Sequence, residues 1–253
     1  MLAKRIIPCL DIQDGKTIKG IRFENLREVG DPVSLAANYS ENGADELVLL
    51  DIGATNEKRD ILLSLVKEIS NVVNIPLTVG GGLYKIKNVE DLLSSGADKV
   101  AINTFAFLNP ELIEELSIRF GTQSIVLSID TKYTKYDKEW KVFLNGGRVK
   151  TERNVLDWAK EAVRRGAGEI LITSMKNDGT KEGFDLEITQ KLSEKLSVPI
   201  ISSGGAGKNK HFLEVLDLGK ADAALAASVF HFKEIEIIEL KKYLKIHGIH
   251  VRI

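Results

Sequence analysis

The sequence predicts a single (β/α)8 barrel, and two observations carry this prediction. The chain has 253 residues, a length at which α/β barrels commonly fold as one domain. Eight short apolar runs alternate along it with longer amphipathic segments. The runs are continuously hydrophobic, which is typical of parallel strands covered on both faces. A doubly wound open sheet is the alternative that this pattern leaves open.

The expected elements follow one another in strand–helix order. The expected strands are residues 5–11, 46–51, 75–80, 99–103, 124–130, 169–174, 198–203 and 223–227. The clearest helices are residues 32–42, 89–95, 156–165 and 235–246. Asp31 is placed to cap the first of these helices, and Gly43, Gly96 and Gly166 follow the ends of the first three. The last helix is acidic early and basic late, which suits the helix dipole.

The two halves of the chain repeat each other. Gly43-Ala-Asp-Glu46 matches Gly166-Ala-Gly-Glu169, 123 residues further on, and Gly81 matches Gly205 at a spacing of 124. Asp11 and Asp130 each end the first strand of a half. This self-similarity predicts two half-barrels, roughly residues 1–120 and 121–253, within one domain.

Composition excludes several classes of protein. Lys and Arg number 35 against 36 Asp and Glu, so the basic excess of a nucleic-acid binder is absent. A single cysteine, Cys9, cannot form an internal disulfide, and no Cys/His cluster has metal-ligand spacing. No apolar run reaches the ~18 residues of a membrane span, and the N-terminus is a poor signal peptide. We therefore expect a cytoplasmic protein without metal or cofactor.

Two glycine-rich turns follow expected strands, at residues 79–82 and 203–207. Glycine lets backbone N–H groups approach a phosphate, although it can also simply permit a tight turn. A hydroxyl residue follows each turn by about twenty residues, Thr104 in the first half and Ser228 in the second. The duplication favours two phosphate sites, so we expect a ligand with a phosphate at each end. Asp178-Gly179 can contribute to the second site.

Asp11 and Asp130 end strands that lie opposite each other in an eight-stranded barrel. Active sites of this fold lie at the carboxyl ends of the strands. Two carboxylates on opposite sides of a substrate can act as general acid and general base. The alternative is two unrelated rim charges, but the pairing with two phosphate sites favours catalysis. A third strand-end carboxylate, Asp51, is expected to be structural.

Residues 14–31 are predicted to form a long polar loop after the first strand. Loops of this length are usually functional or disordered. Lys19 beside Gly20 can close over an anionic substrate, or it can be an ordinary solvated lysine.

At the opposite face, four strands begin with charged residues: Arg5, Glu46, Lys99 and Glu169. Strand starts converge on the barrel floor, so these side chains are expected to form a ring of two positive and two negative groups. An ordinary salt-bridge cluster that closes the floor is the plainer interpretation.

Seven segments of the chain form a recognisable set: residues 1–11, 79–82, 96–100, 166–170, 178–181, 203–207 and 221–232. Together they resemble one enzyme family, the cyclase subunit of imidazole glycerol phosphate synthase. The resemblance implies a (β/α)8 fold and a step of histidine biosynthesis. The substrates would be phosphoribulosyl-formimino-aminoimidazole carboxamide ribonucleotide, a bisphosphate, and ammonia. The products would be imidazole glycerol phosphate and aminoimidazole carboxamide ribonucleotide.

The resemblance also assigns roles to residues. Asp11 and Asp130 match the catalytic acid/base pair, and Lys19 matches a lysine of the mobile loop that holds substrate. Gly82, Asn103 and Thr104 match one phosphate site. The residues that match the other are Asp178, Gly179, Gly204, Gly205, Ala227 and Ser228. Arg5, Glu46, Lys99 and Glu169 match a gate through which ammonia enters from a glutaminase subunit, docked on the barrel floor near Asp98.

The chain departs from the family pattern at four positions. Gly53 stands where threonine is usual, Arg22 where asparagine is common, Ala101 for a frequent serine and Lys176 for a frequent aspartate. These departures affect the details of substrate contact rather than the fold. Two other functions are considered. A sister isomerase of the pathway would share the phosphate sites but use no ammonia, and a non-catalytic or engineered scaffold would need neither aspartate.

Overall fold

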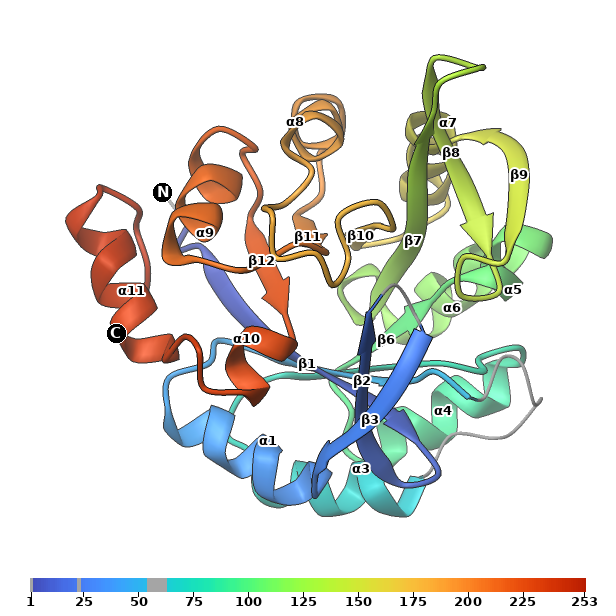
Figure 1. The fold of residues 1–253 in the computed structure, drawn as a ribbon. Coiled ribbons are helices and arrows are strands. Elements are labelled where there is room, and N and C mark those ends of the chain that lie inside the picture. Colours follow the sequence, from blue (N-terminus) through green and yellow to red (C-terminus); the bar gives the residue numbers. More distant parts are fainter. Residues whose placement is uncertain (1, 22–23, 54–62) are drawn as a thin grey trace.

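A closed parallel barrel of eight strands forms the centre of the computed structural model, which describes residues 2–21, 24–53 and 63–253 (Figure 1). The strands are hydrogen-bonded in the circular order β1-β4-β5-β6-β7-β10-β11-β12. Pairing of β7 with β10 and of β12 with β1 closes the ring, which an open doubly wound sheet cannot do. The predicted (β/α)8 fold is therefore confirmed.

All eight expected strands are present, with small differences at their ends. The barrel strands are β1 (Arg5–Gln13), β4 (Leu47–Asp51), β5 (Leu77–Gly80), β6 (Lys99–Ile102), β7 (Ile125–Thr134), β10 (Glu169–Ser174), β11 (Ile200–Ser203) and β12 (Ala223–Ala226). The outer helices are α1 (Pro32–Glu41), α3 (Leu63–Ser70), α4 (Ile86–Ser94), α6 (Glu111–Phe120), α7 (Val155–Arg164), α8 (Leu186–Lys195), α9 (Asn209–Asp217) and α11 (Ile237–Ile246). The short helices are α5 (Thr104–Leu108), α10 (Ser228–His231) and η1 (Thr122–Ser124).

Two antiparallel hairpins extend the barrel, one after β1 and one after β7. β2 (Lys16–Ile21) pairs with both β1 and β3 (Glu24–Gly30), so the prediction of an irregular loop over residues 14–31 is wrong. Thr17 and Ile18 are buried, so this segment gains apolar packing as well as backbone pairing. The second hairpin comprises the end of β7 with β8 (Glu139–Leu144) and β9 (Val149–Asn154). Each hairpin follows the first strand of a predicted half-barrel.

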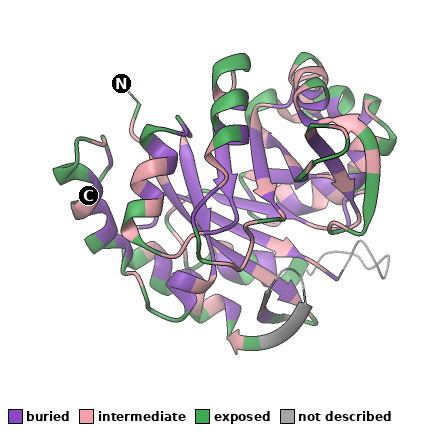
Figure 2. Ribbon diagram, turned by 45° about the horizontal axis from the view of Figure 1, so that its top comes forward, coloured by how far each residue is buried: buried purple, intermediate pink, exposed green. Residues whose placement is uncertain are grey.

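The hydrophobic core forms two layers. The larger layer lies between the strands and the helices and includes Ile6, Leu10 and Trp158. A smaller cluster fills the barrel interior and includes Ile7, Cys9 and Val126. Because successive strand residues point to opposite faces, Ile6 and Ile7 enter different layers. Figure 2 shows the buried strands at the centre and exposed residues along the outer sides of the helices.

Three aspartates fasten the start of one strand to the start of a neighbouring strand. The backbone N–H groups of Ile6, Leu77 and Ile200 donate to the carboxylates of Asp45, Asp98 and Asp222, at 2.8, 2.8 and 3.0 Å. Each aspartate follows the alanine of a repeated helix–strand junction. At the fourth such junction Gly168 replaces aspartate, since an added Cβ would lie 2.1 Å from the Thr122 carbonyl oxygen.

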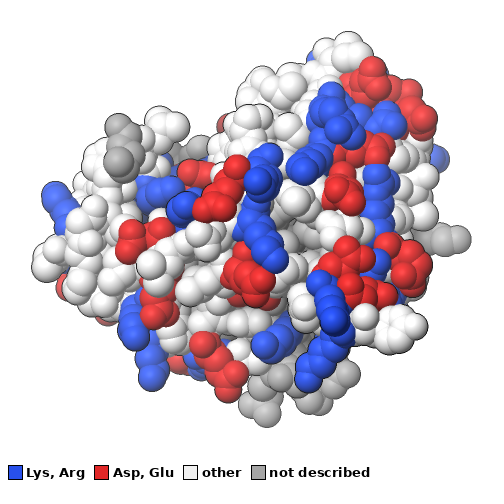
Figure 3. All heavy atoms as spheres, turned by 90° about the horizontal axis from the view of Figure 1, so that it is seen from above, with Lys and Arg blue, Asp and Glu red and all other residues white. Residues whose placement is uncertain are grey.

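The described residues contain no helix that is both long and apolar enough to cross a membrane. On the face seen in Figure 3, acidic and basic side chains are intermixed, in line with the formal net charge of −1. This charge pattern offers no broad basic surface on that face for a polyanion.

The aspartate at residue 45 is expected to contribute more stability than its counterpart at residue 222. Asp45 pairs with Lys241 at 2.9 Å, and both side chains are almost fully buried. Asp45→Ala leaves the Lys241 ammonium buried without its partner, which costs about 3–5 kcal/mol of unfolding free energy. Asp222→Ala removes the same kind of backbone contact from a half-exposed side chain, at a cost of about 1–2 kcal/mol. Urea unfolding of both variants measures the difference, and equal losses would contradict this explanation.

Candidate active site

A cavity of about 370 Å³ opens at the carboxyl ends of the barrel strands. Its lining comes from the ends of seven of the eight barrel strands and from the loops that follow them. Ten of the predicted site residues line it: Asp11, Asn103, Thr104, Asp130, Asp178, Gly179, Gly204, Gly205, Ala227 and Ser228. The fold therefore gathers residues from both halves of the chain around one hollow, at the face where barrel enzymes bind substrate.

The two strand-end carboxylates occupy different environments in this cavity. Asp130 on β7 is only 8% exposed, and the side-chain amide of Asn103 donates to it at 3.0 Å. Burial raises the pKa of Asp130 to about 6, the Asn103 hydrogen bond opposes this shift, and the charge of Asp178 adds to it. Asp11 on β1 is less buried, and the Cys9 thiol lies 3.6 Å from its carboxylate as a donor. One carboxyl group can therefore exchange a proton near neutral pH.

The two glycine-rich turns have matching backbone conformations. Gly81 has φ of 103° and Gly205 has φ of 101°, values that side-chain-bearing residues rarely adopt. A Cβ at Gly81 would lie 2.2 Å from the Asp51 carbonyl oxygen, and one at Gly205 would lie 2.0 Å from the Gly183 carbonyl oxygen. The end of β4 fills the space that a side chain would need at Gly81, and the loop after β10 fills it at Gly205. Glycine at 81 and 205 is thus required by both conformation and packing.

The hydroxyl of Thr104 is held in a definite orientation. The backbone N–H of Asn145 donates to Thr104 Oγ1 at 2.9 Å. Because the oxygen accepts this bond, the hydroxyl proton is directed elsewhere and can be donated to a ligand. Ser228, which follows β12, lines the cavity from the other half of the chain.

Two predicted site residues are placed differently from the rest. Gly82 is buried one position beyond the cavity lining, and its neighbour Gly81 occupies the lining instead. Lys19 lies in β2, but its side chain is outside the described part of the structure. Arg22 also lies outside the described residues.

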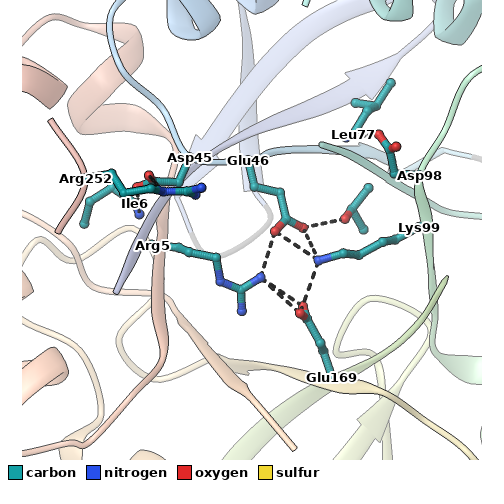
Figure 4. A network of polar contacts seen from close by, with 10 residues as sticks. Arg5, Ile6, Asp45, Glu46, Leu77, Asp98, Lys99, Glu169 and Arg252 are labelled. Carbon is teal, nitrogen blue, oxygen red and sulfur yellow. Dashed lines mark hydrogen bonds and ion pairs between the residues drawn. The ribbon is translucent and has the colours of Figure 1, made fainter. Parts of the chain in front are cut away.

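The four charged residues of the barrel floor form the ring that the sequence predicts (Figure 4). Arg5 contacts Glu46 at 2.8 Å and Glu169 at 3.0 Å. Lys99 contacts the same two carboxylates at 3.1 and 3.2 Å. Each cation thus bridges both anions, and the side chains close the barrel axis between them.

Burial and charge balance explain why this ring holds together. Glu46 is 1% exposed and also accepts a hydrogen bond from the Thr78 hydroxyl at 2.7 Å. Burial lowers the pKa of Arg5, but the charges of Glu169 and Glu46 outweigh it, so the pKa is raised overall. Two cations against two anions give the buried cluster no net charge, which is the condition for keeping charges away from water.

Sequence reasoning missed the turn between β8 and β9, where Asn145, Gly146 and Arg148 line the cavity. The Asn145-Gly146 dipeptide is a recognisable hairpin signal between strand-forming residues. It predicts a turn, but not that the turn folds over the barrel mouth. Ser128 and Thr173 were also missed as lining residues. Ser128 lies two residues before Asp130 and Thr173 lies two residues after Leu171, so the two-residue period of a strand places both on the inward face.

No cluster of three or more metal-ligating side chains occurs among the residues that the structure describes. Fold and cavity together define the class: a (β/α)8 barrel whose mouth holds a cavity lined by strand-end carboxylates and glycine-rich turns.

Comparison with known proteins places the chain within this class. Residues 5–236 match the family of histidine biosynthesis proteins. The chain is 57% identical to imidazole glycerol phosphate synthase subunit HisF of Flavobacterium johnsoniae, over the full length of both proteins. It is 53% and 56% identical to the same subunit of Geobacillus thermodenitrificans and Bacteroides thetaiotaomicron, again at full coverage. The chain belongs to the HisF family, the cyclase subunit of imidazole glycerol phosphate synthase.

The raised pKa of Asp130 predicts a pH-dependent cost to stability. An aspartate titrates near 3.9 in an unfolded chain and Asp130 near 6 in the fold. The native state then binds more protons between these values, so stability falls as pH rises through this window. Asp130→Asn should remove a cost on the order of 2–3 kcal/mol above pH ~6.5 and have little effect below pH ~3.5. Denaturant unfolding between pH 3.5 and 8 tests this, and a pH-independent difference from wild type would refute it.

Proposed function

We propose that this chain condenses ammonia with phosphoribulosyl-formimino-aminoimidazole carboxamide ribonucleotide. The products are imidazole glycerol phosphate, aminoimidazole carboxamide ribonucleotide and water. The observation that carries the proposal is one cavity whose lining includes Asp11, Asp130 and glycine turns from both halves of the barrel. Such a cavity suits a substrate with a phosphate at each end and its reacting atoms between.

The phosphates are bound by the groups that the resemblance assigns. Gly82, Asn103 and Thr104 hold one end, with Gly81 supplying the cavity surface beside them. Asp178, Gly179, Gly204, Gly205, Ala227 and Ser228 surround the other. Backbone N–H groups and hydroxyls can hold phosphate without a large basic surface, which is compatible with the nearly neutral chain. Lys19 is proposed to close over the bound substrate.

Asp130 and Asp11 alternate as base and acid. Ammonia attacks the substrate carbonyl, whose oxygen leaves as water, the imidazole ring closes on the formimino carbon, and the C–N bond to the carboxamide ribonucleotide breaks and releases it. Asp130 has its pKa near the working range because burial disfavours its charged form. It can therefore take up and return a proton within one turnover.

Ammonia is proposed to reach the cavity through the floor. The relatives are named as a subunit, and we infer that the partner is a glutaminase docked on the floor near Asp98, an exposed residue. The ring of Arg5, Glu46, Lys99 and Glu169 is the gate. Because each cation bridges both carboxylates, at least one ion pair must open for ammonia to pass. The sister isomerase uses no ammonia and would have no need of a gate.

Asp11→Asn and Asp130→Asn are each expected to lower ammonium-dependent turnover by about 10²–10⁴-fold, the usual contribution of a positioned acid or base. Affinity for the bisphosphate should stay close to that of wild type, because neither carboxylate binds a phosphate. Loss of substrate measured with ammonium salt gives turnover, and calorimetry gives affinity.

Asp51→Asn is the matched control, since Asp51 is a third strand-end carboxylate on the same cavity and accepts a hydrogen bond from Gly53 N–H at 3.1 Å. It should lose far less activity than either catalytic variant. Wild-type turnover in Asp11→Asn or Asp130→Asn would rule out that residue's role.

The gate has a separate test. Lys99→Met removes the cation that bridges Glu46 and Glu169, so the floor loses its closure. In the complex with a glutaminase, the amount of glutamine hydrolysed per imidazole product should rise severalfold, because ammonia escapes before it reacts. Lys87→Met on α4, an exposed lysine paired within its helix, is the control. Unchanged coupling in Lys99→Met would argue against the gate.

A further inference from the structure

The turn that joins β8 to β9 brings a positive charge to an otherwise acidic cavity. Four aspartates line the cavity: Asp11, Asp51, Asp130 and Asp178. Among the lining side chains that the structure describes, Arg148 is the one cation. A bisphosphate brought into this hollow meets four carboxyl groups, so a cation there has a large effect on binding.

This turn is anchored on two sides of the barrel mouth. The N–H of Asn145 donates to Thr104 Oγ1 at 2.9 Å, which ties the turn to the first residue of α5. Gly147 has φ of 82° and lies so close to Met175, after β10, that a Cβ would come within 2.4 Å of the Met175 methyl group. Arg148 follows directly and is itself solvent-exposed at the cavity rim. Its backbone is therefore held at the mouth, while its side chain is accessible to a ligand.

The hydrogen bond between Asn145 and Thr104 places Arg148 near one particular end of the ligand. Thr104 belongs to the first of the two phosphate sites, and the turn that carries Arg148 is bonded to its hydroxyl oxygen. Backbone N–H groups and hydroxyls provide hydrogen bonds but no full charge, whereas a guanidinium offers both charge and paired donors that match phosphate oxygens. The first site gains from Arg148 a compensating charge that its glycine and threonine cannot supply.

We propose that the Arg148 guanidinium binds the substrate phosphate that lies against Thr104. This inference rests on the proposed function, because it takes the ligand to be a bisphosphate. Arg148 is a binding residue that sets affinity for one end of the substrate, and it takes no part in proton transfer.

The test compares three variants in the ammonium-dependent reaction at constant ionic strength. Arg148→Met keeps the length of the side chain and removes the charge, and it should raise KM for the bisphosphate ~10- to 100-fold, the usual effect of losing a charged hydrogen bond, with a much smaller change in kcat. Arg148→Lys should recover part of the loss. Lys150→Met is the matched control, because this lysine lies two residues away in β9, pairs with Asp137 at 3.0 Å and is not part of the cavity lining.

The products locate the contact, since each carries one of the two phosphates. Calorimetric titration of Arg148→Met with each product should show weakened binding of one and near-wild-type binding of the other. Equal loss for both products, or wild-type KM and product affinities, would overturn the assignment. Failure of the proposed function would look different, because the wild-type protein itself would then leave the bisphosphate unconsumed.

Discussion

Closure of the parallel barrel is the constraint on which the rest of the structure depends. Once β7 pairs with β10 and β12 with β1, every second residue of each strand must point into the barrel interior. In β1 these residues are Arg5, Ile7, Cys9 and Asp11. One strand thus contributes a cation to the floor, two apolar side chains to the interior and a carboxylate to the mouth. At the level of Arg5, β6 and β10 add Lys99 and Glu169, and Glu46 is added directly before β4. At the level of Asp11, β7 adds Asp130.

Buried charges are neutralised at the floor of the barrel but not at its mouth. At the floor, two cations and two carboxylates neutralise one another, and the Thr78 hydroxyl satisfies a further oxygen of Glu46. At the mouth, Asp130 is buried beside the neutral amide of Asn103, with Asp178 near enough to repel it. Its carboxylate therefore carries a cost in the folded state. The charge-balanced cluster stabilises the closed floor. At the mouth, a buried carboxyl group without a counter-charge has a raised pKa and can exchange a proton.

Sequence patterns predict those parts of the structure that depend on local periodicity and on chain symmetry. The eight apolar runs locate all the barrel strands, and charges at the starts of four runs predict the floor ring, because strand starts must converge. The hairpins are harder to predict. Residues 14–31 are polar enough to suggest a loop, yet Thr17 and Ile18 become buried once β2 pairs with β1. Arg148 is harder still, since its place at the cavity depends on a contact between Asn145 and Thr104, 41 residues apart. Gly82 is the predicted site residue of the first glycine-rich turn, and its neighbour Gly81 lines the cavity instead. This difference of one residue lies within a turn that the sequence located.

The account as a whole claims that one ligand spans the barrel mouth, with a phosphate at each end and an aspartate on either side. A crystal structure of the protein with the bisphosphate substrate, prepared without ammonia, tests this most directly. We predict one phosphate against Thr104, the other against Ser228, and the carboxyl groups of Asp11 and Asp130 facing the substrate between them. A substrate bound with only one phosphate in the cavity, or with both aspartates on the same side of it, would contradict the account.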